Sequence, residues 1–209
     1  MRPCYTTFLS LMLLSLCATA ADPQNAKLSS PSPAGGSWIQ EATLTATGAV
    51  PGSLLGYASA IDGDTVAVAN ASEVCVFTKS SSGWNSMTQT AILTPSISGA
   101  VKFGQSVAIS GNTIVVGAPQ QTVGSNQLQG AVYVFVKPAG GWVNATETAM
   151  LTASDGAAND FLGSSVAIDG TTIVAGAPSH NSGGGGATGT AYVYVEPAGG
   201  WVSGPASRL

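Results

Sequence analysis

GQSVAISGNTIVVGAP at residues 104–119 returns as GSSVAIDGTTIVAGAP at residues 163–178, a shift of 59 residues along the chain. The likeness continues through Tyr-Val-x-Val at 133–136 and 192–195 to Pro-Ala-Gly-Gly-Trp at 138–142 and 197–201. An internal repeat of about this length indicates a solenoid, a propeller or another repeated array. The repeat therefore restricts the fold class before any single residue is considered.

The composition of the 209-residue chain favours β-sheet. Only 8% of the residues are charged and 27 are glycine, a combination that is typical of strands separated by many turns. The net charge of −4 weighs against a nucleic-acid partner, because no cluster of Lys and Arg is present to displace counterions from phosphates. Binding to acidic membranes is disfavoured for the same reason.

The N-terminus has the three parts of a secretory signal, namely Arg2, an apolar run at 8–17, and a predicted cut between Ala20 and Ala21. A transmembrane anchor is the alternative, but the run is shorter than the roughly 20 apolar residues that a span needs. A bacterial lipoprotein signal is disfavoured by the bulky Leu16. We therefore expect a secreted, extracellular or periplasmic protein with no membrane span after removal of the signal.

The predicted organisation has three parts: a signal peptide at 1–20, a flexible Ser/Pro/Gly-rich lead-in at 21–37 and the repeated region at 38–209. Two of the three cysteines fall inside the signal, so the mature chain cannot form a disulfide of its own. The remaining one, Cys75, stands at the strand position of Tyr133 and Tyr192, where we expect a small buried hydrophobic side chain.

Each repeat contains four candidate strands separated by turn signals. The repeats lie at about 54–94, 102–152 and 161–209, and the first is the most divergent. In the middle copy the candidates are Gln105–Ser110, Thr113–Ala118, Gly130–Lys137 and Trp142–Thr152. Short Gly-containing turns join the first strand to the second and the third to the fourth, which predicts antiparallel meanders.

The third strand of the middle copy is apolar on both faces. Val132, Val134 and Val136 point one way, while Ala131, Tyr133 and Phe135 point the other. Sheets that are covered on both sides and repeated around an axis are the blades of a β-propeller. A β-sandwich is the alternative, but it leaves the repeat unexplained. We predict an all-β fold, a partial β-propeller of about three four-stranded antiparallel blades.

Three blades are fewer than the roughly four to eight that form known rings. The segment Trp38–Ala46 looks like an outer strand without a blade of its own, so we expect it to supply the outer edge of the third repeat. The alternatives are a longer protein, assembly with other chains, or self-association through open apolar blade faces.

Phe103-Gly104 followed by Gly117-Ala118-Pro119 resembles the FG-GAP repeat, found in the propeller at the head of integrin α subunits and in many secreted proteins. Two other pairs are similar: Leu162-Gly163 with Gly176-Ala177-Pro178, and Leu55-Gly56 with a divergent Ala69-Asn70-Ala71. The resemblance implies propeller blades, cell adhesion, and recognition of an extracellular protein or glycan by loops on one rim.

The Ca²⁺ loop of some integrin-like repeats does not carry over to this chain. Its place is taken by tight turns that hold Asp62 and Asp64 in the first copy and Asp169 in the third, too few for the six to eight oxygens that calcium takes. Asp155 and Asp160 are an alternative Ca²⁺ site, although Asp-Gly and Asn-Asp are also ordinary turn sequences. We expect no cofactor, with calcium at this pair as the alternative.

The residues indicate no catalytic group. His180, the one histidine, lies in the Gly-rich loop Ser179–Gly189 and is predicted to be a solvated loop residue. The run of glycines at 183–186 lacks the Lys-Ser/Thr of a phosphate-binding loop. We therefore predict that the protein is not an enzyme.

Four loops are expected on one rim: Gln120–Gln129, Ser179–Gly189, Pro95–Lys102 and Ala153–Phe161. The predicted binding residues are polar side chains of the first two loops: Gln120, Gln121, Asn126, Gln127, His180 and Asn181. A structural piece of a larger propeller, with no binding activity of its own, is the alternative.

Asn70 and Asn144 each begin an N-glycosylation acceptor triplet. Modification of Asn70 is disfavoured, because the matching position of the other repeats is the Ala of Gly-Ala-Pro, a small residue expected to be buried.

Overall fold

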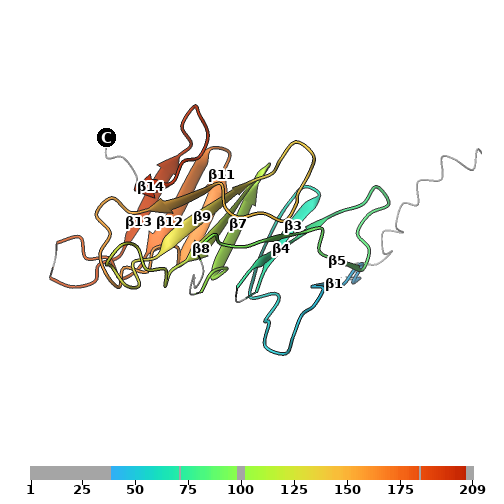
Figure 1. Ribbon diagram of the computed structural model, residues 1–209, viewed down its shortest axis with the longest axis horizontal. Coiled ribbons are helices and arrows are strands. Elements are labelled where there is room, and N and C mark those ends of the chain that lie inside the picture. The colour runs from blue at the N-terminus through green and yellow to red at the C-terminus, as the bar shows by residue number, and fades with distance from the viewer. Residues whose placement is uncertain (1–38, 71, 98–101, 184, 206–209) are drawn as a thin grey trace, which may run out of the picture. The chain divides into compact units, whose positions relative to one another are not determined.

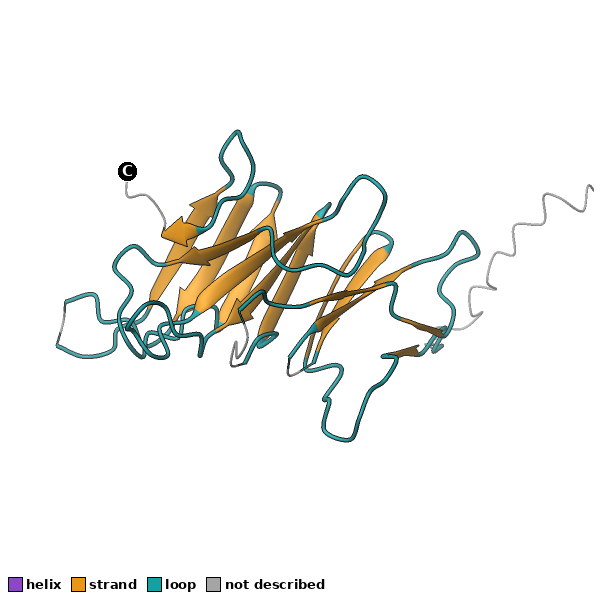
Figure 2. Cartoon of the chain, in the orientation of Figure 1, coloured by secondary structure: helices purple, strands orange, loops and turns teal. Residues whose placement is uncertain are grey.

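The computed structural model of the chain describes residues 39–70, 72–97, 102–183 and 185–205 (Figure 1). The chain divides into two units, Met1–Trp38 and Ile39–Leu209, and the predicted signal peptide and lead-in fall in the first, outside the described residues. The described residues form strands and loops (Figure 2), and none of them belongs to a helix that could span a membrane.

The strands fall into three successive antiparallel blades. Blade 1 is β2(Ala58–Asp62), β3(Thr65–Ala69), β4(Val74–Thr78) and β6(Ala91–Leu93); blade 2 is β7(Ser106–Ser110), β8(Thr113–Ala118), β9(Ala131–Val136) and β10(Ala149–Thr152); blade 3 is β11(Ser165–Asp169), β12(Thr172–Ala177) and β13(Thr190–Val195). Three short strands pair outside these meanders: β1(Leu44–Thr45) with β5(Met87–Thr88), and β14(Gly204–Pro205) with β10, each in parallel. The fold is all-β and corresponds to a partial β-propeller, as predicted.

Local sequence explains the inner hairpins of the blades. The β2–β3, β7–β8 and β11–β12 turns each contain a glycine with φ of 53–55°, at Gly63, Gly111 and Gly170. This left-handed conformation is the one that tight hairpin turns need and that glycine adopts without strain. The bounds of β8 are those predicted, and β9 is one residue shorter at each end than the predicted strand.

Two predictions about outer strands are wrong. The strand predicted from Trp142 is confined to Ala149–Thr152, because Trp142 is buried in the core between blades instead of continuing the ladder. The segment predicted to complete the third repeat lies elsewhere: Leu44 and Thr45 pair with β5, next to blade 1. Trp38, the first residue of that segment, is outside the described residues.

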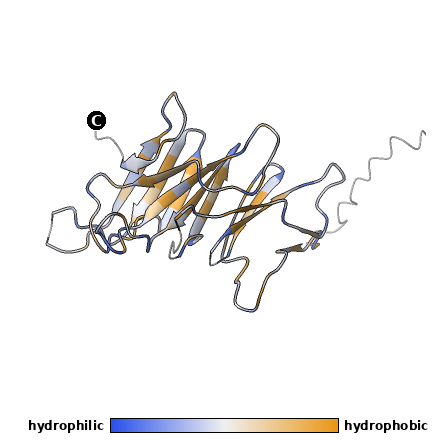
Figure 3. Ribbon diagram, viewed as in Figure 1, coloured by the Kyte–Doolittle hydropathy of each residue, from blue (hydrophilic) through white to orange (hydrophobic). Residues whose placement is uncertain are grey.

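Both faces of blade 2 are buried, as the alternation in its third strand predicts. Tyr133 and Phe135 pack with β3, β4 and β6 of blade 1, whereas Val132 and Val134 pack with Ile173 and its neighbours in blade 3. Figure 3 shows hydrophobic residues concentrated along the strands. Each blade is therefore held by the apolar faces of the blades beside it, since burial of apolar surface is the main favourable term in folding.

Glycines allow the backbones of blades 2 and 3 to approach each other closely. The Gly163 carbonyl lies so near Gly117 that a Cβ added to Gly117 would be 2.0 Å from that oxygen. Ser106 donates to the same carbonyl at 2.8 Å. At the junction before it, a Cβ on Gly104 would be 2.8 Å from the Asn70 carbonyl. The Phe-Gly element of one blade thus packs on the Gly-Ala-Pro element of the blade that precedes it.

Gly117→Ala is expected to destabilise the protein by about 3 kcal/mol, because the new methyl group forces the two backbones of the junction apart. Gly140→Ala is the matched control: its Cβ meets no atom within 4 Å, and a change within about 0.5 kcal/mol is expected. Urea unfolding of both variants measures the two effects. Equal unfolding midpoints would contradict a tight junction.

Cys75 is fully buried on the face of blade 1 that contacts Leu44 and Trp84. Its expected role as a small buried side chain is confirmed. Burial, with a smaller contribution from the Glu73 carboxylate, raises the pKa of the thiol from 9.0 to about 11. A neutral thiol without access to solvent is a poor nucleophile, since the thiolate is the reactive form.

We expect a thiol-specific reagent at pH 8 to modify Cys75 only after unfolding in urea. The raised pKa also predicts the sign of a pH effect: the stabilising contribution is complete below pH 9 and falls as the pH rises toward about 11, because the folded state keeps its proton longer than the unfolded state. Rapid modification of the folded chain at pH 8 would show that this face of blade 1 opens.

Candidate functional site

Three loops meet at the junction between blades 2 and 3, and we call their described residues the rim cluster: 119–130, 153–161, 179–183 and 185–189. Backbone hydrogen bonds join the first two, from Asn159 N–H to the Gln127 carbonyl at 2.9 Å and from Phe161 N–H to the Leu128 carbonyl at 3.1 Å. The Ser179 N–H donates to the Asp160 carbonyl at 3.4 Å and joins the third. Loops of two blades and the connection between them therefore form one structure.

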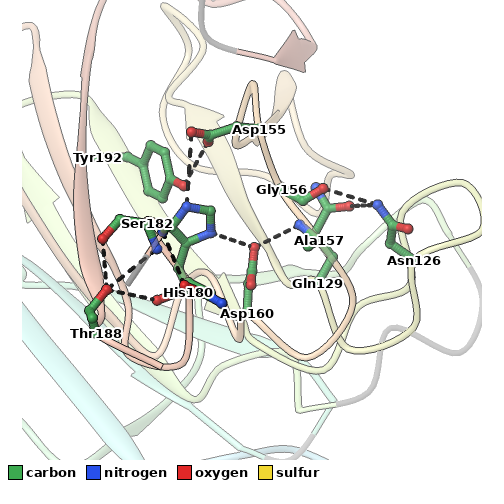
Figure 4. A network of polar contacts seen from close by, with 12 residues as sticks. Asn126, Gln129, Asp155, Gly156, Ala157, Asp160, His180, Ser182, Thr188 and Tyr192 are labelled. Carbon is green, nitrogen blue, oxygen red and sulfur yellow. Dashed lines mark hydrogen bonds and ion pairs between the residues drawn. The ribbon is translucent and has the colours of Figure 1, made fainter. Parts of the chain in front are cut away.

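The centre of the rim cluster is a buried contact between His180 and Asp160 (Figure 4). The His180 Nδ1 atom lies 2.8 Å from Asp160 Oδ2, and the two residues are 6% and 3% exposed. The same carboxylate oxygen accepts the Ala157 N–H at 2.7 Å. Buried polar groups need hydrogen-bond partners, so this contact ties the third loop to the blade connection.

Asp155 extends the contact outward. Its carboxylate accepts the Tyr192 hydroxyl at 2.8 Å, and its other oxygen lies 3.9 Å from His180 Nε2. Burial, and then the hydrogen bond to Asp155, raise the pKa of Tyr192 above its usual value. The imidazole consequently lies between two carboxylates, with the Tyr192 ring edge-on to it at 5.8 Å between centroids.

The amide side chains of the first loop also make internal contacts. Asn126 Nδ2 donates to Gln129 Oε1 and to the Gly156 carbonyl, both at 3.0 Å. Gln121 is 5% exposed and accepts the Tyr133 hydroxyl at 3.1 Å. These contacts hold the loop on the blade beneath it and on the neighbouring connection.

Three non-glycine residues of the rim cluster have left-handed backbone conformations: Leu128 at φ 57°, Asn159 at φ 69° and Phe161 at φ 58°. Such a conformation costs on the order of 1 kcal/mol or more for Leu and persists where the surrounding structure determines it. The hydrogen bonds between the two loops hold these conformations, since they involve the Asn159 N–H, the Phe161 N–H and the Leu128 carbonyl.

The structure brings His180 against Asp155 and Asp160, a pair that the sequence analysis treated separately from the histidine. The prediction of a solvated His180 is wrong, because the ring is buried against Asp160. Sequence reasoning missed Tyr192, whose link to Asp155 spans 37 residues. The signal was its place in the repeat, at the strand position of Tyr133, which is another tyrosine that hydrogen-bonds to a rim residue.

The other predicted binding residues differ in accessibility. Gln127 and Asn181 are exposed, Gln120 and Asn126 are half-buried, and Gln121 is buried. The Pro95–Lys102 loop includes residues 98–101, which are outside the described residues.

The predicted calcium pair serves the protein's own groups. Asp160 accepts from Ala157 and contacts His180, and Asp155 contacts Tyr192. Within the described ranges, no group of three or more His, Cys, Asp or Glu side chains is arranged to hold a metal ion.

The two glycosylation candidates have different environments. Asn70 is 5% exposed, and its Oδ1 atom accepts the backbone N–H groups of Ser72 and Glu73, both at 2.8 Å. Asn144 is exposed, and its Oδ1 atom accepts the Ile92 N–H at 2.8 Å. Asn144 is therefore the more accessible of the two.

The family model for the FG-GAP repeat matches residues 87–135 and 145–194. The first match begins at β5, just before the outer strand β6 of blade 1, and ends in β9, the third strand of blade 2. The second begins just before the outer strand β10 of blade 2 and ends in β13, the third strand of blade 3. Among solved structures, the chain is similar at 12% identity to the computationally designed Ika4 protein, with a TM-score of 0.32 over 75% of this chain and 99% of that one. No curated protein matches the chain.

Asp160→Ala is expected to destabilise the protein by about 2 kcal/mol, because it leaves the Ala157 N–H and His180 Nδ1 without their buried partner. Hydrogen exchange at Ala157 and Ser179 should accelerate more than exchange in blade 1. Asp64→Ala is the control, since the Asp64 side chain is 65% exposed in its ion pair with Lys79 and such pairs contribute little. Unchanged exchange in the Asp160 variant would show that the loops do not depend on this contact.

Proposed function

We propose that this chain, which is an FG-GAP repeat protein, is a secreted, non-catalytic module that binds an extracellular protein or glycan through its rim cluster. The observation that carries the proposal is the union of three loops by hydrogen bonds into one structure at a blade junction. A rigid scaffold that presents loops in fixed positions is the arrangement on which binding sites are commonly built.

The buried polar network supports binding by lowering its entropic cost. A loop that is ordered before the ligand arrives does not have to be ordered by the ligand. The His180–Asp160 contact and the bonds from Asn159 and Phe161 hold the loops in that way. The exposed amide side chains of Gln127 and Asn181 then lie on loops whose backbones are already fixed.

The chemistry of the exposed groups favours a neutral polar ligand. An amide side chain offers both a donor and an acceptor, which suits sugar hydroxyls and peptide groups alike. Only 8% of the chain is charged, so electrostatic attraction contributes little. A partner with matching hydrogen-bonding groups therefore fits this surface better than a strongly charged one.

The environment of His180 supports a non-catalytic role. A general base must reach the proton that it removes, directly or through one water molecule. The ring of His180 is 6% exposed, with one nitrogen on Asp160 and the other directed toward Asp155. This geometry is suited to holding loops together.

The alternative is a structural role within a larger propeller. The tightly packed blade junction at Gly117 and Gly163 favours it, since that contact serves architecture whether or not a ligand binds.

The test uses the exported protein, whose N-terminus we expect at Ala21, on a glycan array and on immobilised extracellular-matrix proteins. The double variant Gln127→Ala, Asn181→Ala should lose about tenfold in affinity for whichever probe binds, the loss expected for about two hydrogen bonds. Asn112→Ala, in the β7–β8 turn at the other end of the strands, is the control and should bind normally. Equal affinity of the double variant would exclude the rim cluster, and an absence of binding to every probe would favour the structural role.

A further inference from the structure

Each junction between successive blades is built from the same three links, and the first involves the outer strand. The sequence Ala-x-Leu-Thr occurs at 91–94 in β6 and at 149–152 in β10. On one side these strands pair antiparallel with β4 and β9 of their own blades. On the other side Ile92 N–H donates to Asn144 Oδ1 at 2.8 Å and Met150 N–H to Ser203 Oγ at 3.0 Å, which joins each blade to the next.

β1 resembles the outer strands β6 and β10 both in its sequence and in its hydrogen bond to the blade that follows it. Residues 42–45 read Ala-Thr-Leu-Thr, and Thr43 N–H donates to Ser86 Oγ at 3.0 Å, the counterpart of the bonds made by Ile92 and Met150. The Thr43 carbonyl accepts the Met87 N–H on the same side. Because successive backbone groups of a strand face opposite ways, the N–H and C=O groups of Ala42 and Leu44 face away from blade 1. That is the side on which β6 and β10 pair with their own blades.

β13 has no outer strand beside it within the described residues. Its pairing is with β12 alone, whereas the corresponding β4 and β9 are each covered by an outer strand. Val193 and Val195 are 60% and 65% exposed, while Val134, which corresponds to Val193, is fully buried. A groove of about 450 Å³ follows this edge, lined by residues that include Val193, Val195, Trp201 and Val202. An exposed apolar strand edge of this kind is a site for strand addition.

The second link joins the inner turns. Gly111 N–H donates to Asp62 Oδ2, and Gly170 N–H donates to Ser110 Oγ at 3.1 Å, so each turn receives a hydrogen bond from the turn of the following blade. In blade 3 the exposed Asp169 stands at the position of the acceptors Asp62 and Ser110. In blade 1 the exposed Gly63 stands at the position of the donors Gly111 and Gly170.

The third link is the close approach of glycines. Gly104 and Gly163 each pack on the backbone of the preceding blade, whereas a Cβ on the corresponding Gly56 of blade 1 meets nothing within 4 Å. Gly176 of blade 3 corresponds to Gly117, but a Cβ there meets only Ser165 of its own blade. Each of the three links is therefore incomplete at both ends of the described blades. One of its two parts is without its counterpart at blade 1, and the other is without its counterpart at blade 3.

We infer that two copies of this chain associate head to tail, with residues 42–45 of one copy added to the β13 edge of the other. The internal pairs Leu93–Val74 and Leu151–Val132 set the register: Leu44 lies opposite Ala191, Thr43 opposite Tyr192 and Ala42 opposite Val193. The occupant is a second copy because the interface continues the blade junction already present twice in the chain. The described blades of two copies together number six, within the range of about four to eight that closed propellers use.

Cross-linking tests the pairing and its register. Full-length chains carrying Ala42→Cys and, with a different tag, Val193→Cys are mixed under mild oxidation, and a disulfide-linked heterodimer is expected. The predicted pair lies directly opposite, within the Cα separation that a disulfide allows. Ala42→Cys mixed with Val195→Cys is the control: the second cysteine is displaced by two residues on the same face, and the cross-link should be lost. The native Cys75 is buried and does not compete.

Light scattering of the unsubstituted chain is the second measurement, and an associated species is expected. A peptide of residues 39–48 should reduce its mass to that of a single chain, and the same peptide with Leu44→Pro should not, because proline removes the N–H group that faces β13. A single chain at every concentration, with no 42–193 cross-link, would overturn the inference. Equal cross-linking of 42 to 193 and to 195 would do so as well.

Discussion

The structure depends on the approach of one blade's backbone to the next at Gly117 and Gly163. At this point a carbonyl occupies the space that a side chain would take, so the two sheets lie close enough for their apolar faces to interdigitate. Tyr133 and Phe135 on one face of blade 2, and Val132 and Val134 on the other, are fully or almost fully buried for this reason. The two halves of the FG-GAP repeat are therefore two sides of one junction, each contributed by a different blade.

The rim cluster is a consequence of that junction. Because blades 2 and 3 are held at a fixed distance, the loops that leave their strands on one rim meet and can be joined by short hydrogen bonds. Asp160 precedes the Leu162-Gly163 element by two residues, and His180 follows Gly176-Ala177-Pro178 by two. The buried contact between them thus links residues just outside the two repeated elements of blade 3. At the first junction the corresponding loop, residues 70–73, is much shorter, and Asn70 fills the space with bonds to Ser72 and Glu73. The junction keeps its geometry while the loops above it vary.

The two ends of the described blades are not equivalent, although the blades themselves are. The outer face of blade 1, with Cys75 and Phe77, is covered by Leu44, Ala46 and other residues of its own chain. The outer face of blade 3 leaves Val193 and Val195 exposed. With few charged residues to keep copies apart, such a difference between the ends gives association a direction, since a heterologous contact joins unlike surfaces.

The sequence by itself determined the inner hairpins of the blades and the two faces of β9. The period of two in Ala131–Val136 divided the side chains of β9 correctly between its two faces, and the glycines of the inner turns placed the hairpins, because both signals are local. The tertiary structure decided what depends on segments far apart in the chain. Trp142 packs between blades and leaves the outer strand short, β1 pairs with β5, and His180 is enclosed by Asp160 and Asp155. None of these contacts follows from a local period, since each joins segments that lie far apart in the chain. The burial of Trp142 also requires the spacing of two blades, which the glycine junctions set.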